Sequence, residues 1–279
     1  MKSAGFQSVG LAQLMLSYVH NLNTNMKILV INHHKSCNAE RFQPWLEEAG
    51  FEIDNRLGAI GQLPQHVYYS TDSLAHDHFA AMIVTGGGYN LDGSGGAWWL
   101  PHTGKLMREA IQQDMPVLGI CLGGQLLAYT LGGQIDGCHC QIKSCTKPFE
   151  YGLTDIHLTQ AGQDDPLFVG LGRDIIMHEN HQAYIAELPN GAELLARSDR
   201  CPVEAFRYGQ NAYGIQFHPE VAADTIDNWS QAKIQHLIEA GVDWPAIVAR
   251  RNSSDVDANL TASRQICNNF ANIVQNRAK

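Results

Sequence analysis

Short apolar runs alternate with amphipathic stretches in the first half of the chain. Four of these runs predict strands, the first of them typical of a strand buried on both faces of a parallel sheet: residues 27–32, 51–54, 79–88 and 116–121. Helical patterns occupy residues 39–49, 97–114 and 125–133. Strands that alternate with helices indicate a parallel α/β sheet with right-handed crossover connections.

The pattern changes in the second half, where short runs lie close together and are separated by turns. They predict five further strands: residues 151–159, 174–178, 192–198, 202–208 and 212–218. Two helices, at about 223–240 and 255–275, close the chain. We therefore expect an α/β fold in which a mostly parallel sheet has helices on both faces and an antiparallel extension.

Residues 1–25 lie before the first strand and differ from the rest. Their apolar run, 11–19, is too short to span a bilayer, and no small-residue cleavage site follows it. We predict a poorly ordered extension or a surface helix over 1–25, with Met26 as an alternative start. A single domain then covers 26–279, with its C-terminal helices beginning at about 223.

The charge balance narrows the range of partners. The chain has 19 Lys and Arg against 28 Asp and Glu, a net charge of −9, and no basic cluster. This argues against a nucleic-acid partner and against an anionic membrane. Seven cysteines, an odd number at irregular spacing, favour reduced thiols and hence a cytoplasmic location.

Cys121 lies in the segment 119–123, Gly-Ile-Cys-Leu-Gly, where the fourth predicted strand gives way to a helix. This is the cysteine version of the G-x-S-x-G turn that exposes a nucleophile above a sheet. The N-terminus of a helix favours the thiolate, and the N–H of Leu122 would face an oxyanion formed there. The alternative is a small buried core residue, the usual fate of a lone cysteine.

The segment 214–220, Gly-Ile-Gln-Phe-His-Pro-Glu, supplies a base and a residue to orient it. His218 and Glu220 are two positions apart on an extended segment, so their side chains point the same way. Glu220 can then hold one ring nitrogen of His218 while the other nitrogen serves a thiol. Taken alone, a His-x-Glu pair is common, but together with the turn at Cys121 it predicts a triad.

The segment 85–88, Thr-Gly-Gly-Gly, ends the third predicted strand. Glycines at this edge bring backbone N–H groups to the crevice where parallel α/β sheets bind ligands. Gly87 or Gly88 is the predicted second oxyanion donor, and a plain glycine-rich turn is the alternative.

Together, residues 85–88, 119–125 and 216–220 resemble the class I glutamine amidotransferase family, the type with a Cys-His-Glu triad. The LGG at 131–133 and the E-x-G strand at 150–159 agree, and residues 187–199 resemble the GMP-synthetase-like branch. The resemblance covers roughly residues 26–221 and implies a flavodoxin-like fold.

The resemblance implies that Cys121 attacks the side-chain amide of glutamine, forming a γ-glutamyl thioester and releasing ammonia. His218 would move the protons, Glu220 would orient His218, and Gln125 would lie near the amino-acid end of the substrate. No cofactor is implied. Because nothing in the sequence resembles a P-loop, the ammonia acceptor would belong to a synthetase or other acceptor subunit in trans.

The sequence departs from the family at residues 177–189. His181 aligns with a substrate-pocket histidine, but Gln182 and Ala183 replace the Gly and Asp that follow it in the family. The Asn-His-Gln piece is also similar to γ-glutamyl hydrolases of the same fold. Hydrolysis of another γ-glutamyl amide or peptide therefore stays open, with His178 and His181 as candidate pocket residues. A non-catalytic module that only binds a partner is the third hypothesis.

A metal site is not predicted. The cluster Cys138, His139, Cys140 and Cys145 lacks the two separated ligand pairs typical of zinc sites. His76 and His78 flank Asp77 before a strand and are expected to be solvated.

Overall fold

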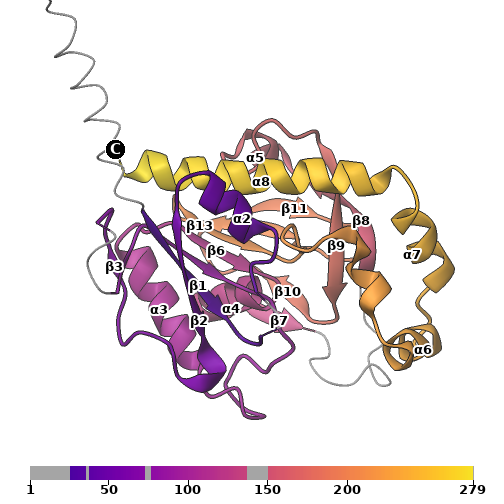
Figure 1. Ribbon diagram of the computed structural model, residues 1–279, viewed down its shortest axis with the longest axis horizontal. Coiled ribbons are helices and arrows are strands. Elements are labelled where there is room, and N and C mark those ends of the chain that lie inside the picture. The colour runs from indigo at the N-terminus through magenta and orange to yellow at the C-terminus, as the bar shows by residue number, and fades with distance from the viewer. Residues whose placement is uncertain (1–25, 36–37, 73–76, 137–149, 279) are drawn as a thin grey trace, which may run out of the picture.

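The computed structural model describes residues 26–35, 38–72, 77–136 and 150–278. A sheet of nine strands runs through the molecule (Figure 1). The strand order is β2-β1-β5-β6-β13-β12-β11-β8-β9. Five neighbouring strands are parallel: β2 (Glu52–Leu57), β1 (Lys27–Asn32), β5 (Ala81–Val84), β6 (Val117–Ile120) and β13 (Ala212–Ile215). Four strands continue the sheet in antiparallel pairing: β12 (Ala205–Tyr208), β11 (Ala192–Arg197), β8 (Glu150–Leu158) and β9 (Asp174–His181).

Helices cover both faces of this sheet (Figure 1). On one face lie α2 (Phe42–Glu48) and α8 (Asp255–Arg277), over a core that contains Phe42 and Phe270. On the other face lie α3 (Leu100–Gln112) and α4 (Leu122–Thr130), over a core that contains Met107 and Leu126. The short helices are η1 (Gly58–Ile60), α5 (Gln160–Asp164), η3 (Ala223–Asn228), α6 (Gln231–Glu239) and α7 (Trp244–Arg251).

The predicted fold class is confirmed, with differences in detail. Two small sheets went unpredicted: β3 (Tyr68–Tyr69) with β4 (His78–Phe79), and β7 (Gln134–Asp136) with β10 (Tyr184–Glu187). Strands of two to four residues are too short to produce a recognisable period. The predicted extension 1–25 and the cysteines at 138–145 lie outside the described residues.

The C-terminal region contains more helices than the two predicted from its pattern. Helix α6 ends before Gly241, whose φ of 89° belongs to the left-handed region typical of a helix C-terminus. Helix α7 then begins at Trp244, and the side chain of Asp243, its N-cap residue, accepts a hydrogen bond from the N–H of Ala246. In the described part of the chain, every helix is too short or too polar to cross a membrane.

Glycines let α4 approach the sheet more closely than side chains would allow. A Cβ on Gly123 would lie 2.1 Å from the backbone oxygen of Val84 in β5. A Cβ on Gly124 would lie 2.6 Å from the oxygen of Ile215 in β13. Because both obstacles are backbone atoms, neither clash is relieved by rotating a side chain, and Cys121 at the start of α4 is fixed directly above the sheet.

We expect Gly123→Ala to destabilise the fold by about 3 kcal/mol, because its methyl group displaces α4 from β5. Gly88→Ala is the matched control: a Cβ there meets nothing within 4 Å, so a change of about 0.5 kcal/mol or less is expected. Urea unfolding of both variants measures the difference. Equal stabilities would show that α4 does not depend on this close approach.

Candidate active site

Cys121 occupies a sharp turn between β6 and α4. Its φ of 50° and ψ of −107° lie in a region that non-glycine residues rarely adopt. The N–H of Cys121 donates to the oxygen of Ile215 at 2.8 Å, and its own oxygen accepts from the N–H of Gln125 at 2.9 Å. One hydrogen bond fixes Cys121 to the sheet and the other fixes it to the helix, and together they stabilise its strained backbone conformation.

His218 and Glu220 follow β13, the strand that pairs with β6. Nδ1 of His218 lies 2.7 Å from Oε1 of Glu220, and the N–H of His218 donates to the backbone oxygen of His178 at 2.8 Å. Nε2 of His218 contacts Cys121, and this contact helps to raise the pKa of His218. Among the described residues Nε2 has no other hydrogen-bond partner. A Cβ on Gly86 would lie 2.9 Å from Cε1 of His218 and 3.6 Å from Cβ of Cys121, so both side chains converge on this glycine.

The charge state of His218 is set by its neighbours. Burial alone would lower the pKa of His218, but the negative charges of Glu220 and Cys121, and hydrogen bonds to both, raise it well above its ordinary value. His178 lies beside His218, and burial together with the positive charge of His218 lowers the pKa of His178 to about 3. The two imidazoles therefore differ in charge at neutral pH.

A pocket of about 370 Å³ opens above Cys121, a volume that accommodates an amino-acid-sized ligand. It is lined by the following residues singled out in the sequence: Gly87, Gly88, Cys121, Gln125, His178, His181, His218 and Glu220. Leu122 is outside the lining, but its side chain is 3.1 Å from the position of a Cβ on Gly87. As the first residue of α4, Leu122 also has an N–H without a partner in the helix.

Gln216 is a neighbour of Cys121 that sequence reasoning missed. Its Nε2 donates to Sγ of Cys121 at 3.5 Å, and its Oε1 accepts from Nε2 of Gln125 at 3.1 Å. Gln125 also donates to the oxygen of Ala183 at 2.8 Å, so its amide nitrogen supports the pocket wall. Alternation along 216–220 was the available signal, since Gln216, His218 and Glu220 share one side of an extended segment.

Arg41 was also missed, because its partners are distant in sequence. Its guanidinium donates to the oxygen of Pro219 at 3.2 Å and to Asn259 and Ser263 of α8 at 2.9 and 3.0 Å. The loop that carries His218 and Glu220 is thereby tied to the long C-terminal helix. Next to it, Glu40 lines the pocket; burial, with the nearby charge of Glu220, raises the pKa of Glu40 to about 6.

A family model described as glutamine amidotransferase class-I matches residues 51–230. The chain belongs to the class I glutamine amidotransferase family. Membership places this amidotransferase among cysteine-dependent amidohydrolases.

Relatives of this amidotransferase include glutamine-hydrolyzing GMP synthases. That of Clostridium perfringens is 36% identical over 155 residues, which cover 55% of this chain and 27% of the relative. One subunit of the glutamine-hydrolyzing GMP synthase of Pyrococcus furiosus is 34% identical over 155 residues, which cover 53% of this chain and 73% of that relative. The similarity therefore spans about a quarter of the clostridial protein and most of the archaeal one.

Solved structures share the fold of this amidotransferase. A glutamine amidotransferase from Thermotoga maritima superposes with a TM-score of 0.69 at 19% identity, covering 88% of this chain and 98% of that one. A second glutamine amidotransferase, from Methylobacillus flagellatus, superposes with a TM-score of 0.70 at 20% identity, covering 88% of this chain and 94% of that one. The flavodoxin-like arrangement implied by the sequence resemblance is thus confirmed.

We expect Glu220→Gln to lower the pKa of His218, because the variant removes the negative charge that raises it. A histidine whose pKa is raised on folding adds stability below its unfolded pKa of about 6.5, and that stability is lost as pH rises through the folded pKa. The difference in Tm between wild type and variant should therefore be larger near pH 6 than in alkaline solution. A difference that does not change with pH would contradict this assignment, and NMR titration of His218 checks the pKa directly.

Proposed function

We propose that this protein hydrolyses the side-chain amide of glutamine and supplies the ammonia to an acceptor held by a partner protein. The observation that carries the proposal is the convergence of Cys121, His218 and Glu220 at the base of a pocket of suitable size. Membership of the family supports it. The seven irregularly spaced cysteines favour the cytoplasm as the place of the reaction.

The first half of the proposed reaction forms a thioester. The thiol proton of Cys121 is held on Nε2 of His218, and the Sγ thiolate attacks the amide carbon of glutamine. The N–H groups of Leu122 and of Gly87 or Gly88 stabilise the negative charge that develops on the amide oxygen. The imidazolium then protonates the amide nitrogen, the C–N bond breaks, and ammonia leaves.

The second half releases glutamate. His218 takes a proton from water, which attacks the thioester carbon, and the same N–H groups stabilise the second oxyanion. The C–S bond breaks and the thiolate leaves, while His218 keeps the proton taken from water, which restores the starting state. Glu220 holds Nδ1 of His218 throughout, so that Nε2 stays directed at the reacting atoms.

The outer pocket suits the α-amino-acid end of glutamine. Glu40 provides a carboxylate for the α-ammonium group, and Asn38, Asn180 and Gln182 provide amide groups for the α-carboxylate. Gln182 also belongs to the Asn-His-Gln piece at 180–182 that is similar to γ-glutamyl hydrolases of the same fold. This likeness supports a second candidate function, hydrolysis of a γ-glutamyl amide whose leaving group is larger than ammonia.

The proposal of a partner rests on the relatives. Those of Pyrococcus furiosus and Pyrococcus abyssi are each named as one subunit of GMP synthase, which indicates assembly with another chain. We propose the acceptor by class alone, as an activated electrophile held by a synthetase.

A glutamine-mimicking electrophile, such as a diazoketone analogue, should label Cys121 before the other six cysteines, because Cys121 is the one of the three described cysteines that lines the pocket, and it lies beside the base His218. Peptide mass spectrometry locates the label, and glutamate release is measured in parallel. Cys121→Ser should abolish both. Cys267→Ser, a change at another buried cysteine, should leave both unchanged. Uniform labelling, or sparing of Cys121, would sink the nucleophile assignment.

The isolated chain should hydrolyse glutamine without a partner. The loop 86–96 is held by hydrogen bonds within it, Asn90 to Ser94 at 3.0 Å among them, and by burial of Leu91 in the core. The pocket is therefore formed in the single chain. We expect kcat/KM for glutamine of about 10⁴ M⁻¹s⁻¹ or above, and a lower value for γ-glutamyl anilides. Negligible turnover that a synthetase restores would show that the partner completes the site, and preference for the anilide would favour the second candidate function.

A further inference from the structure

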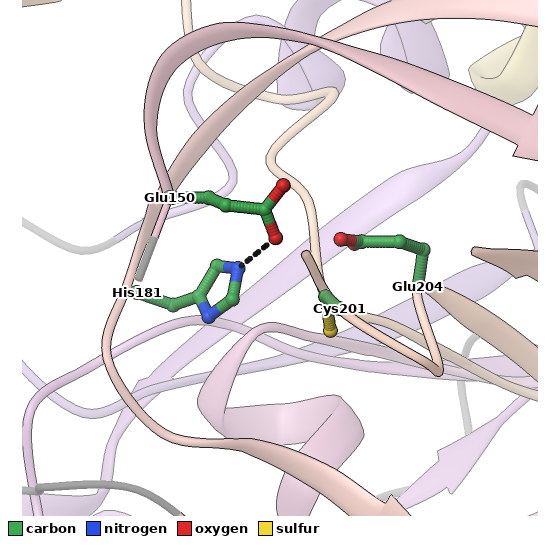
Figure 2. A group of neighbouring side chains, drawn as sticks. All are labelled: Glu150, His181, Cys201 and Glu204. Atoms are coloured by element: carbon green, nitrogen blue, oxygen red, sulfur yellow. Dashed lines mark ion pairs between the residues drawn. The ribbon is translucent and has the colours of Figure 1, made fainter. Parts of the chain in front are cut away.

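Four buried side chains with metal-ligand chemistry lie close together (Figure 2), and one of them, His181, also lines the pocket. Glu150 begins β8, His181 ends β9, and Cys201 and Glu204 belong to the segment between β11 and β12. Glu150 and His181 are direct partners in the β8–β9 pairing, so their side chains lie on the same face of the sheet. One carboxylate oxygen of each glutamate, a ring nitrogen of His181 and the sulfur all lie within 4.8 Å of one another.

The orientation of His181 leaves a nitrogen lone pair directed into this group. Nδ1 of His181 is 3.1 Å from the backbone oxygen of Ala183. A carbonyl oxygen only accepts, so Nδ1 carries the hydrogen and Nε2 of the neutral ring is an acceptor. Metal-binding histidines are held in this way, with the second nitrogen donating to a carbonyl or carboxylate.

Nε2 of His181 faces acceptors. It lies 3.4 Å from Oε2 of Glu150, the contact marked in Figure 2, and 3.4 Å from Oε2 of Glu179. Were the ring charged, hydrogen bonds to these carboxylates would be expected at about 2.7–2.9 Å. By contrast, a tetrahedral metal site with bonds of about 2.0–2.1 Å has edges of about 3.4 Å. The Glu150–His181 separation is thus that of two ligands around one ion.

Glu204 and Glu150 are buried carboxylates with few hydrogen bonds. Glu204 is 0% exposed, and its oxygens have no hydrogen-bond partner among the described residues apart from the contacts with Glu179, Glu150 and Ser198 that bear on its pKa. Oε2 of Glu150 has its ion pair with His181 and no hydrogen-bond partner among the described residues. The other oxygen of Glu150 accepts from the hydroxyl of Ser198 at 2.8 Å, which fixes the direction of Oε2. Buried carboxylates without a cation carry a large desolvation cost.

We infer that Glu150, His181, Cys201 and Glu204 bind one divalent transition-metal ion, and that Zn²⁺ is the best match. One nitrogen, one sulfur and two oxygens suit borderline-soft zinc, whereas magnesium and calcium prefer oxygen alone. The thiol of Cys201 donates to the oxygen of Val203 at 3.4 Å. On binding, the S–H bond breaks, the sulfur–zinc bond forms and one proton is released. On zinc binding, the ligand atoms that are farthest apart, at up to 4.8 Å, must approach one another by about 1 Å to reach tetrahedral geometry.

The inferred ion would be structural. It would tie β8 and β9 to the segment before β12, and so hold the pocket wall that includes His181. No metal site was predicted from the sequence, because zinc ligands are recognisable there as pairs with short spacing, and these four ligands come from three separate segments.

The competing explanation is a network of shared protons. Burial, together with neighbouring carboxylates, raises the pKa of Glu179 and of Glu204 well above the ordinary value. Protonated carboxyl groups would then donate to one another. The two explanations differ in their response to Glu204→Gln, since an amide keeps the shape and the hydrogen-bonding capacity but is a poor zinc ligand.

The test uses the full chain carrying Cys121→Ala, which removes the proposed nucleophile as a zinc-binding thiol and makes the result independent of catalysis. After chelator treatment, zinc is added, excess is removed, and metal content and Tm are measured. We expect about one Zn²⁺ per chain and a raised Tm. Adding Glu204→Gln should weaken zinc binding at least about tenfold. Adding Cys267→Ser, at a buried cysteine of α8, should not.

Two results would overturn the inference. The first is equal zinc content with and without Glu204→Gln. The second is a Cys121→Ala chain that holds no zinc and whose Tm does not change when Glu204→Gln is added. If Glu204→Gln fails to fold, the folded Cys121→Ala chain is loaded with Co²⁺ instead. A sulfur-to-cobalt absorption band that Cys201→Ser removes and Cys267→Ser retains supports the site. Absence of the band, or its persistence without Cys201, refutes it.

Discussion

The backbone contact between α4 and the two strands beneath it is the constraint on which the site depends. Gly123 and Gly124 place the first turn of this helix against backbone oxygens of β5 and β13, at distances that exclude any side chain. The short path from β6 into α4 forces Cys121 to a positive φ, and the sulfur is raised over the edge of the sheet. The strain at Cys121 is therefore a consequence of how closely helix and sheet are packed.

The change from parallel to antiparallel pairing brings the parts of the site together. Strand β13 is parallel to β6 and antiparallel to β12, so its C-terminal end lies beside the end of β6. His218 and Glu220 follow that end directly, and the parallel half supplies Cys121 and the glycines at 86–88. The antiparallel half supplies His178 and His181, which also line the pocket.

The sequence predicted those parts of the site that are local in the chain. The turn around Cys121 and the His218–Glu220 pair are recognisable because their chemistry requires fixed spacing at the end of a strand. Gln216 and Arg41 were missed because their roles come from contacts made across the sheet and with α8. The group around Glu150 and Glu204 was missed for the same reason, since no periodic pattern shows that two distant carboxylates meet. The C-terminal helices differ from the prediction in two ways: Ser230 caps a separate helix, α6, inside the predicted helix 223–240, and α7 lies in the interval 241–254, where no helix was predicted.

Under the proposed mechanism, Cys121 becomes covalently attached to substrate during turnover. The direct measurement is acid quenching of the enzyme during steady-state turnover of glutamine, followed by peptide mass spectrometry. A γ-glutamyl group is expected on the peptide that contains Cys121, and on no other cysteine. Two observations together would contradict this mechanism: ammonia is released without an acylated Cys121 peptide, and the enzyme still turns over glutamine when Cys121 is replaced by serine.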